Sequence, residues 1–157
     1  MDVNTNNELI SKVVNLYSDV IIRIAFQYTK NRADAEDIMQ DVFISFIKQP
    51  PFDNEQYLKA WLIRVAINKS KDYLRAAKRR NTLPLDIFEN TLTEKQKFVL
   101  DELEELSALD RIIIFLFYYE RYTAKEIAKI MDKKEKAILM RLSRAREKLK
   151  HLLEEKK

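Results

Sequence analysis

The sequence predicts an all-α protein made of two small helical domains, and three observations favour this fold class. Apolar residues recur at spacings of three and four along most of the chain, which is the period of an amphipathic helix. Proline, which breaks helices, occurs only at positions 50, 51 and 84. The 157 residues are 46% apolar and 34% charged, so the chain has enough apolar surface to fold into one large domain or two small ones.

Seven helices are expected from this periodicity. Two pairs, Thr93 with Gln96 and Thr123 with Glu126, fit the capping box, in which each side chain accepts a hydrogen bond from the other residue's backbone N–H. The segment Ile112–Tyr119 is rich in β-branched and aromatic residues, which also suits a buried strand, but its helical neighbourhood favours a helix buried on most sides. The expected helices cover residues 7–29, 33–48, 55–79, 94–106, 108–120, 124–131 and 135–153.

Breaks in the helical pattern mark the expected domain boundary. Pro50 and Pro51 end the helix before them, because proline lacks a backbone N–H and restricts the preceding residue. The stretch 81–92 lacks a clear helical period. It is therefore expected to link a domain of residues 1–80 to a domain of residues 93–157.

The composition excludes several classes of site. The chain has no glycine, so the glycine-rich phosphate loops of nucleotide-binding folds are not expected. It has no cysteine, and its single histidine, His151, leaves little for catalytic triads or metal sites. Neither catalytic residues nor a cofactor is therefore expected. The N-terminus resembles no secretory signal and the longest apolar run is far shorter than the roughly 20 residues of a membrane helix, so a soluble, cytoplasmic protein is expected.

Charge is distributed in blocks, which indicates two separate surfaces for a polyanion. Residues 1–58 and 81–110 are net acidic, whereas residues 59–80 hold 8 basic and 1 acidic side chain, and residues 111–157 hold 14 and 7. Like charges concentrated in this way favour phosphate as a partner. A solvated helix face is the alternative interpretation of each basic block.

The first basic block carries a stripe of polar side chains at helical spacing. Its members recur at steps of four and three, so they share one face of a helix. They are Arg64, Asn68, Lys71, Arg75 and Lys78. The opposite face carries Leu62, Ala66, Tyr73 and Ala77 and is the expected core face.

The second basic block has the pattern of a helix-turn-helix. A short helix from Thr123 to Met131 is followed by a tight turn and a longer basic helix, which suits docking in the major groove. The second helix is expected to turn inward Ile138, Leu142, Ala145, Leu149 and Leu152. Base-facing candidates are Lys136, Ala137, Met140, Arg141 and Arg144, and phosphate-facing candidates are Lys133, Lys134 and Lys148. An amphipathic helical hairpin with a basic exterior is the alternative.

Three segments together resemble the sigma-70 family of bacterial transcription initiation factors, in its extracytoplasmic-function (ECF) type. The segment Asp34–Phe43 is similar to region 2.2 of that family. The segment Trp61–Asn68, with Asp72 and Arg75, resembles regions 2.3 and 2.4, and Arg141–Leu149 after Glu126-Ile-Ala resembles region 4.2. The resemblance implies a region 2 helical bundle at 1–80, a linker at 81–92 and a region 4 helix-turn-helix at 93–157.

The resemblance also implies partners for the first domain. Asp37, Gln40 and Asp41 are expected to contact the clamp helices of the largest subunit of core RNA polymerase, although acidic residues in a first helical turn also compensate the helix dipole. The loop after Pro50 and the next helix are expected to read the minus ten promoter element, with an unstacked base held by stacking and hydrogen bonds. The residues assigned to that element are Phe52, Asn54, Gln56, Tyr57, Trp61, Arg64, Asn68, Lys71, Arg75, Lys78 and Arg79.

For the second domain, the resemblance implies recognition of the minus thirty-five element and a contact between Ile112–Tyr119 and the polymerase flap. The chain departs from the family pattern at several positions. Leu139 and Met140 replace polar residues, and apolar side chains can contact thymine methyl groups. Ser107 stands where proline is usual. Glycines common in the family are replaced by Arg121, Asp132 and Lys136.

Two other functions fit parts of the pattern. A stand-alone helix-turn-helix regulator would need no second phosphate-facing helix, whereas this chain has two basic helices. A helical adaptor on an anionic membrane could also use such helices. The sequence favours a sigma factor that binds core RNA polymerase and promoter DNA. Because ECF factors are commonly held by an anti-sigma factor, often a membrane-bound one, the resemblance implies this partner too.

Overall fold

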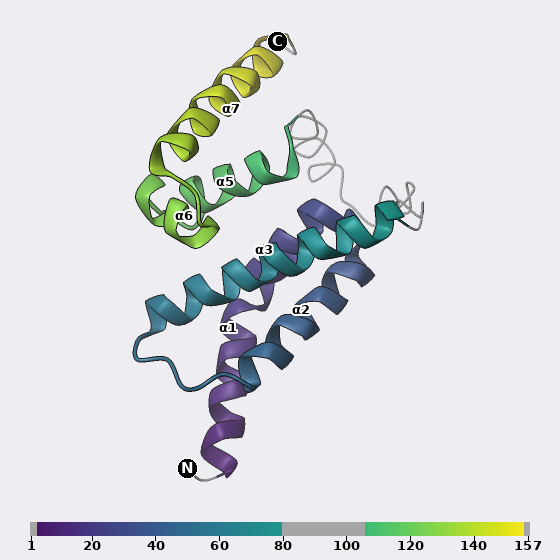
Figure 1. The fold of residues 1–157 in the computed structure, drawn as a ribbon, viewed down its shortest axis with the longest axis vertical. Coiled ribbons are helices and arrows are strands. Elements are labelled where there is room, and N and C mark those ends of the chain that lie inside the picture. The colour runs from purple at the N-terminus through teal and green to yellow at the C-terminus, as the bar shows by residue number, and fades with distance from the viewer. Residues whose placement is uncertain (1–2, 80–105, 156–157) are drawn as a thin grey trace. The chain divides into compact units, whose positions relative to one another are not determined.

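The structure, a computed structural model, describes residues 3–79 and 106–155 and confirms the all-α fold class (Figure 1). Within these residues the chain forms helices and no strand. It divides into two compact units, Met1–Leu85 and Asp86–Lys157. The helices are α1 (Val3–Thr29), α2 (Arg32–Ile47), α3 (Glu55–Arg79), α5 (Ala108–Tyr118), α6 (Ala124–Met131) and α7 (Glu135–Glu155).

Six of the seven expected helices are therefore present, with small differences at their ends. α1 begins four residues earlier than its apolar pattern, because the polar residues at its start carry no hydrophobic period. α5 stops at Tyr118 and α7 continues to Glu155. The expected linker at 81–92, the cap at Thr93 and nearly all of the expected helix at 94–106 lie outside the described residues.

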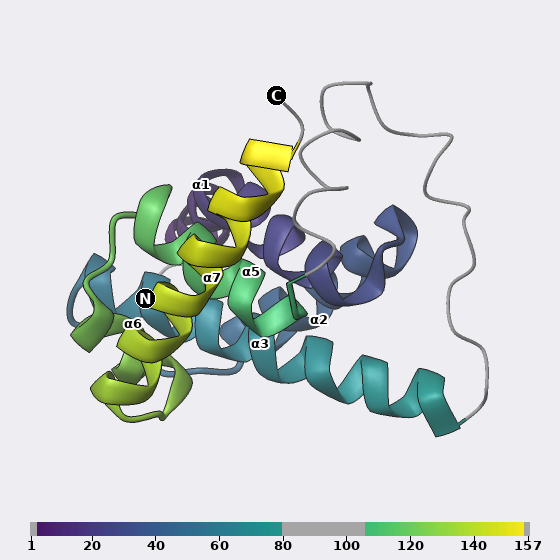
Figure 2. The ribbon, with the colours of Figure 1, turned by 90° about the horizontal axis from the view of Figure 1, so that it is seen from above.

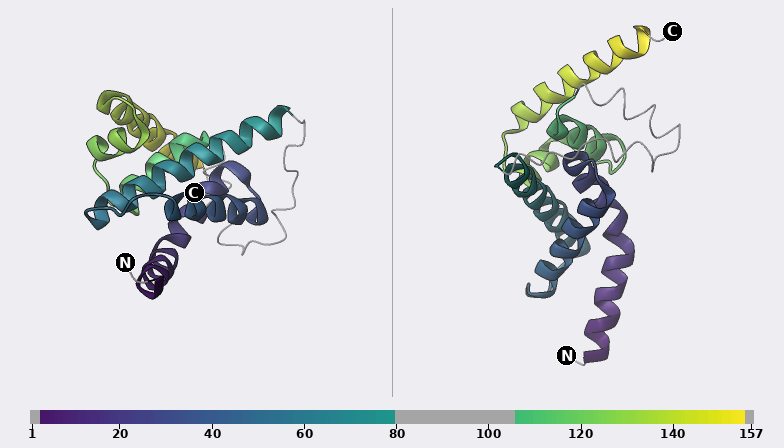
Figure 3. Two further views of the ribbon diagram at one scale, coloured as in Figure 1. Left: turned by 60° about the horizontal axis from the view of Figure 1, so that its bottom comes forward. Right: turned by 90° about the vertical axis from the view of Figure 1, so that its right-hand side faces the viewer.

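In the first unit, α1, α2 and α3 each pack against the other two (Figures 1 and 3). Their shared core is made of fully buried aliphatic side chains, among them Ile21, Ile24, Val42, Leu62 and Ile63. The N-terminal end of α1 runs past the loop that joins α2 to α3. Burial of such side chains is the main favourable contribution to folding, at roughly 1.5–3 kcal/mol each.

The core face of α3 is broader than the expected one. Leu62, Ala66 and Ala77 are buried as expected, but Ile63 and Ile67 are buried too, since α3 packs against both α1 and α2. Tyr73, expected in the core, is only half-buried, and that expectation was wrong. Its hydroxyl donates a hydrogen bond to the carboxylate of Asp34 on α2, so the ring stays at the edge of the core.

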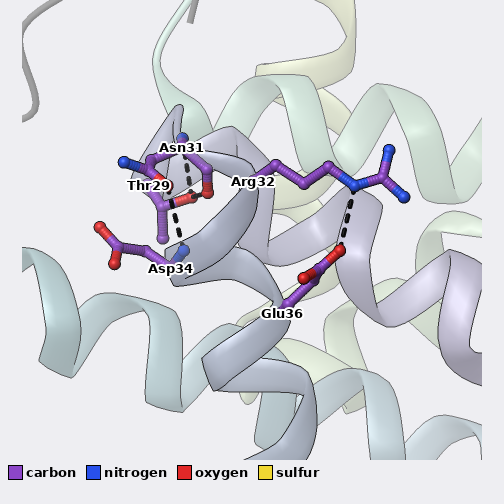
Figure 4. Close-up of polar contacts among 5 residues, drawn as sticks. All are labelled: Thr29, Asn31, Arg32, Asp34 and Glu36. Carbon is purple, nitrogen blue, oxygen red and sulfur yellow. Dashed lines mark hydrogen bonds and ion pairs between the residues drawn. The ribbon is translucent and has the colours of Figure 1, made fainter. Parts of the chain in front are cut away.

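The turn between α1 and α2 is held by side chains and not by glycine (Figure 4). Lys30 adopts a left-handed conformation with φ 50°. The buried Thr29 hydroxyl donates to the carbonyl of Asn31 at 2.9 Å. The Asn31 side chain in turn accepts from the backbone N–H of Asp34 at 3.1 Å and so caps α2. Arg32 forms an exposed ion pair with Glu36 one turn further on, at 3.1 Å.

In the second unit, α5 lies across the α6–α7 helix-turn-helix and supplies part of its core (Figure 2). Ile112, Ile113 and Leu116 of α5 are buried with Ile127 of α6 and Ile138 of α7. The segment of residues 112–119 is thus helical as far as Tyr118. Its residues 112–117 are buried or half-buried, as expected, whereas the two tyrosines that follow are 50% and 73% exposed.

Caps fix the ends of α5 and α6. Ser107, the residue that replaces a family proline, is the N-cap of α5 and accepts from the backbone N–H of Asp110 at 3.1 Å. The expected capping box of Thr123 with Glu126 is confirmed at the start of α6. Arg121 before α6 and Asp132 after it both have positive φ, at 60° and 54°. Of the described helices, none has the length and apolarity needed to cross a bilayer.

Candidate functional site

The exposed face of α3 carries most of the expected basic stripe. Its exposed members are Arg64, Asn68, Arg75 and Lys78, and Arg79, which follows the stripe, is exposed too. Lys71 is half-buried. One exposed ion pair, from Arg75 to Asp72 at 3.5 Å, partly neutralises the stripe. The remaining cations lie on the side of α3 opposite its buried aliphatic residues, so this helix presents a positively charged surface to solvent.

The loop between α2 and α3 is anchored by a cluster of three aromatic rings. The Phe52 ring lies 6.4 Å from the Phe46 ring at the end of α2 and 5.6 Å from the Trp61 ring on α3. Phe52 and Trp61 are both half-buried in this cluster. Two side chains expected to meet DNA therefore stabilise the loop by packing on each other.

Other residues of this loop have different surroundings. The Asn54 side chain accepts from the backbone N–H of Tyr57 at 2.8 Å and caps α3. Gln56 and Tyr57 are exposed, with the Tyr57 residue 67% accessible. Four residues of the loop and the first turn of α3 were expected to read an unstacked base. Of these, Gln56 and Tyr57 are the two whose side chains face solvent and have no capping or packing role among the described contacts.

A cavity of about 310 Å³ lies beside this loop, and α1 supplies much of its wall. Leu9 and Leu16 line it together with Phe52 and Leu58. Both leucines of α1 are about half exposed. Sequence reasoning did not assign α1 to any site, although leucines seven residues apart on an amphipathic helix are a detectable signal.

A hydrogen bond ties the same part of α1 to the start of α3. The Tyr17 hydroxyl donates to Glu55 at 3.3 Å. Burial, and then the charge of Glu55, raise the pKa of Tyr17 above its usual value of 10.0. Tyr17 is therefore a neutral donor at physiological pH, and it holds the N-terminal turn of α3 in place.

An acidic pocket of about 380 Å³ lies between α2 and α3. It is lined by Asp34, Asp37, Ile38, Asp41, Lys69, Asp72 and Tyr73. The structure thus brings Asp37 and Asp41 together, both exposed, while Gln40 is exposed on the same helix but does not line the pocket. Of the acidic residues of α2, only Asp34 lies in the first turn. Dipole compensation therefore accounts for Asp34 and not for Asp37 or Asp41.

The exposed side of α7 carries cations around two apolar side chains. Lys134, Lys136, Arg144 and Lys148 are exposed, whereas Lys133 and Ala137 are half-buried. Leu139 and Met140 are 50% and 45% exposed. The inward face is confirmed at Ile138, Leu142 and Ala145; Leu149 is half-buried, and the side chain of Leu152 is outside the described set.

Two arginines of α7 are engaged with α5. The Arg141 guanidinium donates to Asp110 at 2.8 Å, in an ion pair whose side chains are 37% and 23% exposed. Arg146 lies over the rings of Phe117 and Tyr118, with its guanidinium carbon 5.2 and 5.6 Å from their centres. Sequence reasoning missed Asp110 because nothing along the chain pairs it with a residue 31 positions away.

Arg111, next to Asp110 in α5, is buried and donates to the carbonyl of Leu106 at 2.6 Å. This bond holds the chain entering α5 against the helix. Because Arg111 anchors the entry and Ser107 caps it, the base of the helix-turn-helix has a defined geometry without the usual proline.

The comparisons with known proteins agree with this division into units. The family model for Sigma-70 region 2 matches residues 13–80, and the model for Sigma-70, region 4 matches residues 91–149. The chain is similar to the ECF RNA polymerase sigma factor SigM of Bacillus subtilis (strain 168), with 29% identity over 154 residues that cover 91% of this chain and 94% of SigM. RNA polymerase sigma factor SigV of the same organism is 26% identical over 147 residues, which cover 90% of this chain and 89% of SigV.

Solved structures give the same result. The sigma factor RpoE in its co-crystal structure with the anti-sigma factor NepR from Bartonella quintana matches with a TM-score of 0.75 and 25% identity, covering 92% of this chain and 96% of RpoE. CnrH, in complex with the cytosolic domain of CnrY, has the same fold, with a TM-score of 0.69 and 23% identity over 96% of this chain and 91% of CnrH. Two family regions in this order, on units with this fold, show that the chain belongs to the sigma-70 family of RNA polymerase sigma factors, in its extracytoplasmic-function type.

Proposed function

We propose that this sigma factor joins core RNA polymerase and directs it to promoters by binding one DNA element with each unit. The observation that carries the proposal is that each unit, matched to a different family region, presents one helix with a concentrated cationic face: α3 in the first unit and α7 in the second. Two such faces suit two separate stretches of phosphate backbone. Residues 1–80 and 93–157 then act as the two DNA-binding domains, joined by residues 81–92.

The minus ten element is assigned to α3 and the loop before it. Arg64, Asn68, Lys71, Arg75, Lys78 and Arg79 contact phosphates along the helix. Gln56 and Tyr57 are the best placed to hold an unstacked base, since Tyr57 offers an exposed ring and Gln56 an exposed amide. Phe52 and Trp61 stabilise the loop by packing on each other, and the Asn54 side chain caps the start of α3.

The minus thirty-five element is assigned to α7, which enters the major groove as a recognition helix. Lys136, Ala137, Met140 and Arg144 face the bases, and Lys133, Lys134 and Lys148 hold phosphates. Arg141 is placed at the edge of this surface by its ion pair with Asp110. Arg144 is therefore the main candidate for a hydrogen-bonded base contact.

Contact with core polymerase is assigned to Asp37, Gln40 and Asp41 on α2, against the clamp helices of the largest subunit. The support is their exposure, and for the two carboxylates a position beyond the first helical turn. The exposed tyrosines at the end of α5 suit the polymerase flap, because an exposed aromatic patch favours a protein partner. Since the reaction belongs to the polymerase, the sigma factor supplies no catalytic residue, and it acts in the cytoplasm, where promoter DNA lies.

An anti-sigma factor is a further proposed partner. The support is the similarity to RpoE, which was crystallised with the anti-sigma factor NepR. The stand-alone regulator is less well supported, since the match to region 2 covers most of the first unit.

Transcription by reconstituted holoenzyme tests this proposal. Purified core polymerase, the full chain and a promoter library should give start sites that core polymerase alone does not give. The double substitution Asp37→Ala with Gln40→Ala should weaken core binding, measured by fluorescence anisotropy with labelled sigma factor. Asp19→Ala, an exposed carboxylate on α1, is the matched control and should bind core polymerase as well as the unaltered chain does.

Unchanged core affinity in the double variant would remove the docking assignment on α2. Absence of both a specific transcript and core binding would overturn the function itself. Tight operator binding by the chain without polymerase would instead establish the stand-alone regulator.

A further inference from the structure

The outward face of α7 has an apolar centre. Met140 lies one helical turn from Lys136 on one side and from Arg144 on the other, so the three share one ridge. This ridge points away from the buried residues Ile138 and Leu142. Met140 is 45% exposed, and Leu139 beside it is 50% exposed. Two large apolar side chains thus face solvent in the middle of a cationic surface.

The arginines nearest to this centre are partly committed elsewhere. Arg141 is paired with Asp110 at 2.8 Å, and Arg146 is stacked against the aromatic end of α5. Arg144 is the remaining arginine on the ridge. A recognition helix with this face has cations at the two ends of the ridge and hydrocarbon between them, which suits base edges whose hydrogen-bond acceptors flank an apolar group.

We propose that Met140 and Leu139 read the C5-methyl groups of thymine in the major groove, an inference that rests on the assignment of α7 to the upstream promoter element. Among the four bases, thymine alone carries a methyl group on its major-groove edge. A flexible thioether next to a leucine side chain can enclose such a methyl group. Phosphate contacts from Lys133, Lys134 and Lys148, together with the base-facing cations of the ridge, commit the occupant of this surface to duplex DNA and not to an apolar protein segment.

This readout predicts the composition of the upstream element. At the base pairs facing Met140 and Leu139, a thymine on either strand is favoured over cytosine or guanine. Each enclosed methyl group should strengthen binding about three- to fourfold, because enclosing it removes one methyl-sized apolar group from water. The half-buried Ala137, one turn before Arg141, adds no bulk that would keep the helix out of the groove.

Deoxyuridine substitution isolates the methyl group. Holoenzyme made from core polymerase and the full chain first selects upstream duplexes from a library randomised at the minus thirty-five position. Each thymine in the selected duplex is then replaced in turn by deoxyuridine, which keeps the base pair and removes only the methyl group. We expect one or two positions to lose about three- to fourfold in affinity, while deoxyuridine in the spacer has no effect.

Variants of Met140 assign that loss to this side chain. Met140→Leu keeps an apolar contact and should keep the deoxyuridine penalty. Met140→Gln should bind thymine and deoxyuridine equally at the position that Met140 faces, and its selected element should shift toward adenine there, since a glutamine amide can pair with adenine. The ratio of the two affinities is insensitive to a general loss of folding or of phosphate contacts.

The outcomes separate this inference from the proposed function. Binding that is equally tight with thymine and deoxyuridine at every upstream position overturns the methyl readout and leaves the sigma-factor assignment intact. The same holds if the Met140→Gln variant retains the deoxyuridine penalty at every affected position. If the holoenzyme selects no upstream sequence at all, the assignment of α7 and this inference fall together.

Discussion

Three residues of the described chain occupy backbone conformations that usually favour glycine. Lys30, Arg121 and Asp132 have φ values of 50°, 60° and 54°, in a sequence without glycine. The left-handed region costs a residue with a Cβ about 1–2 kcal/mol, and the cost is smaller for aspartate. Arg121 and Asp132 were identified from the family pattern, and the structure confirms both. Lys30 was missed, because no sequence signal distinguishes a lysine in a turn from one at a helix end.

Glycine at Lys30 should therefore stabilise the first unit. Lys30→Gly relieves the strain at φ 50° but adds flexibility to the unfolded chain, so a net gain of about 0.5–1 kcal/mol in the free energy of unfolding is expected. Trp61, the single tryptophan, lies in the same unit and reports its unfolding by fluorescence in denaturant. Lys30→Ala is the control, since it removes the lysine side chain and keeps the strain. Equal stability of the glycine and alanine variants would show that the backbone at Lys30 is not strained.

The ion pair of Asp110 with Arg141 sets the role of one recognition-helix arginine. Its 2.8 Å geometry and partial burial favour a measurable contribution to the second unit, about 0.5–1 kcal/mol of coupling. A double-mutant cycle with Asp110→Asn and Arg141→Gln, followed by circular dichroism in denaturant, measures that coupling. If the losses in stability of the two single variants sum to the loss of the double variant, the ion pair does not stabilise the fold.

The ion pair also predicts how much Arg141 and Arg144 each contribute to DNA binding. Because Asp110 holds Arg141, Arg144→Ala should weaken binding to the upstream element more than Arg141→Ala, by about 1–3 kcal/mol for a lost base contact. Binding of the two variants in holoenzyme to a mapped promoter, corrected for folded fraction, gives the difference. A larger loss for Arg141→Ala would mean that this arginine leaves Asp110 for DNA.

At the scale of elements, α3 combines a wide core face with a cationic face. The expectation of a basic stripe came from spacing alone and is confirmed as exposed at most positions. The width of the core face could not be predicted, since it depends on α3 packing against two helices and not one. The Phe46, Phe52 and Trp61 cluster was missed for a similar reason, because its three rings come from different elements.

The stripe on α3 should contribute affinity without sequence preference. Arg75→Ala and Arg79→Ala each remove one exposed positive charge, so each should weaken binding to all promoters alike and reduce the slope of affinity against salt by about 1. Titrations of holoenzyme on two different promoters over a range of salt concentrations measure both quantities. Arg23→Ala, an exposed arginine on α1, is the control. A loss restricted to one promoter would show a base contact instead.

At the scale of the whole molecule, the order of motifs was the most predictive feature of the sequence. Two basic helices separated by an acidic stretch predicted two functional units, and family regions match the chain in that order. The details that required the structure are contacts between elements: Tyr73 with Asp34, Tyr17 with Glu55 and Arg141 with Asp110. Polar pairs this far apart leave no periodic trace in a single sequence.

The central claim is that both units bind one promoter together within a polymerase complex. Footprinting of the holoenzyme on a promoter mapped by its transcript start tests this most directly. Two protected segments are expected, at the minus ten and minus thirty-five positions, and Arg144→Ala should weaken the upstream one selectively. A single protected segment, or the same two segments protected by the chain without core polymerase, would contradict the account.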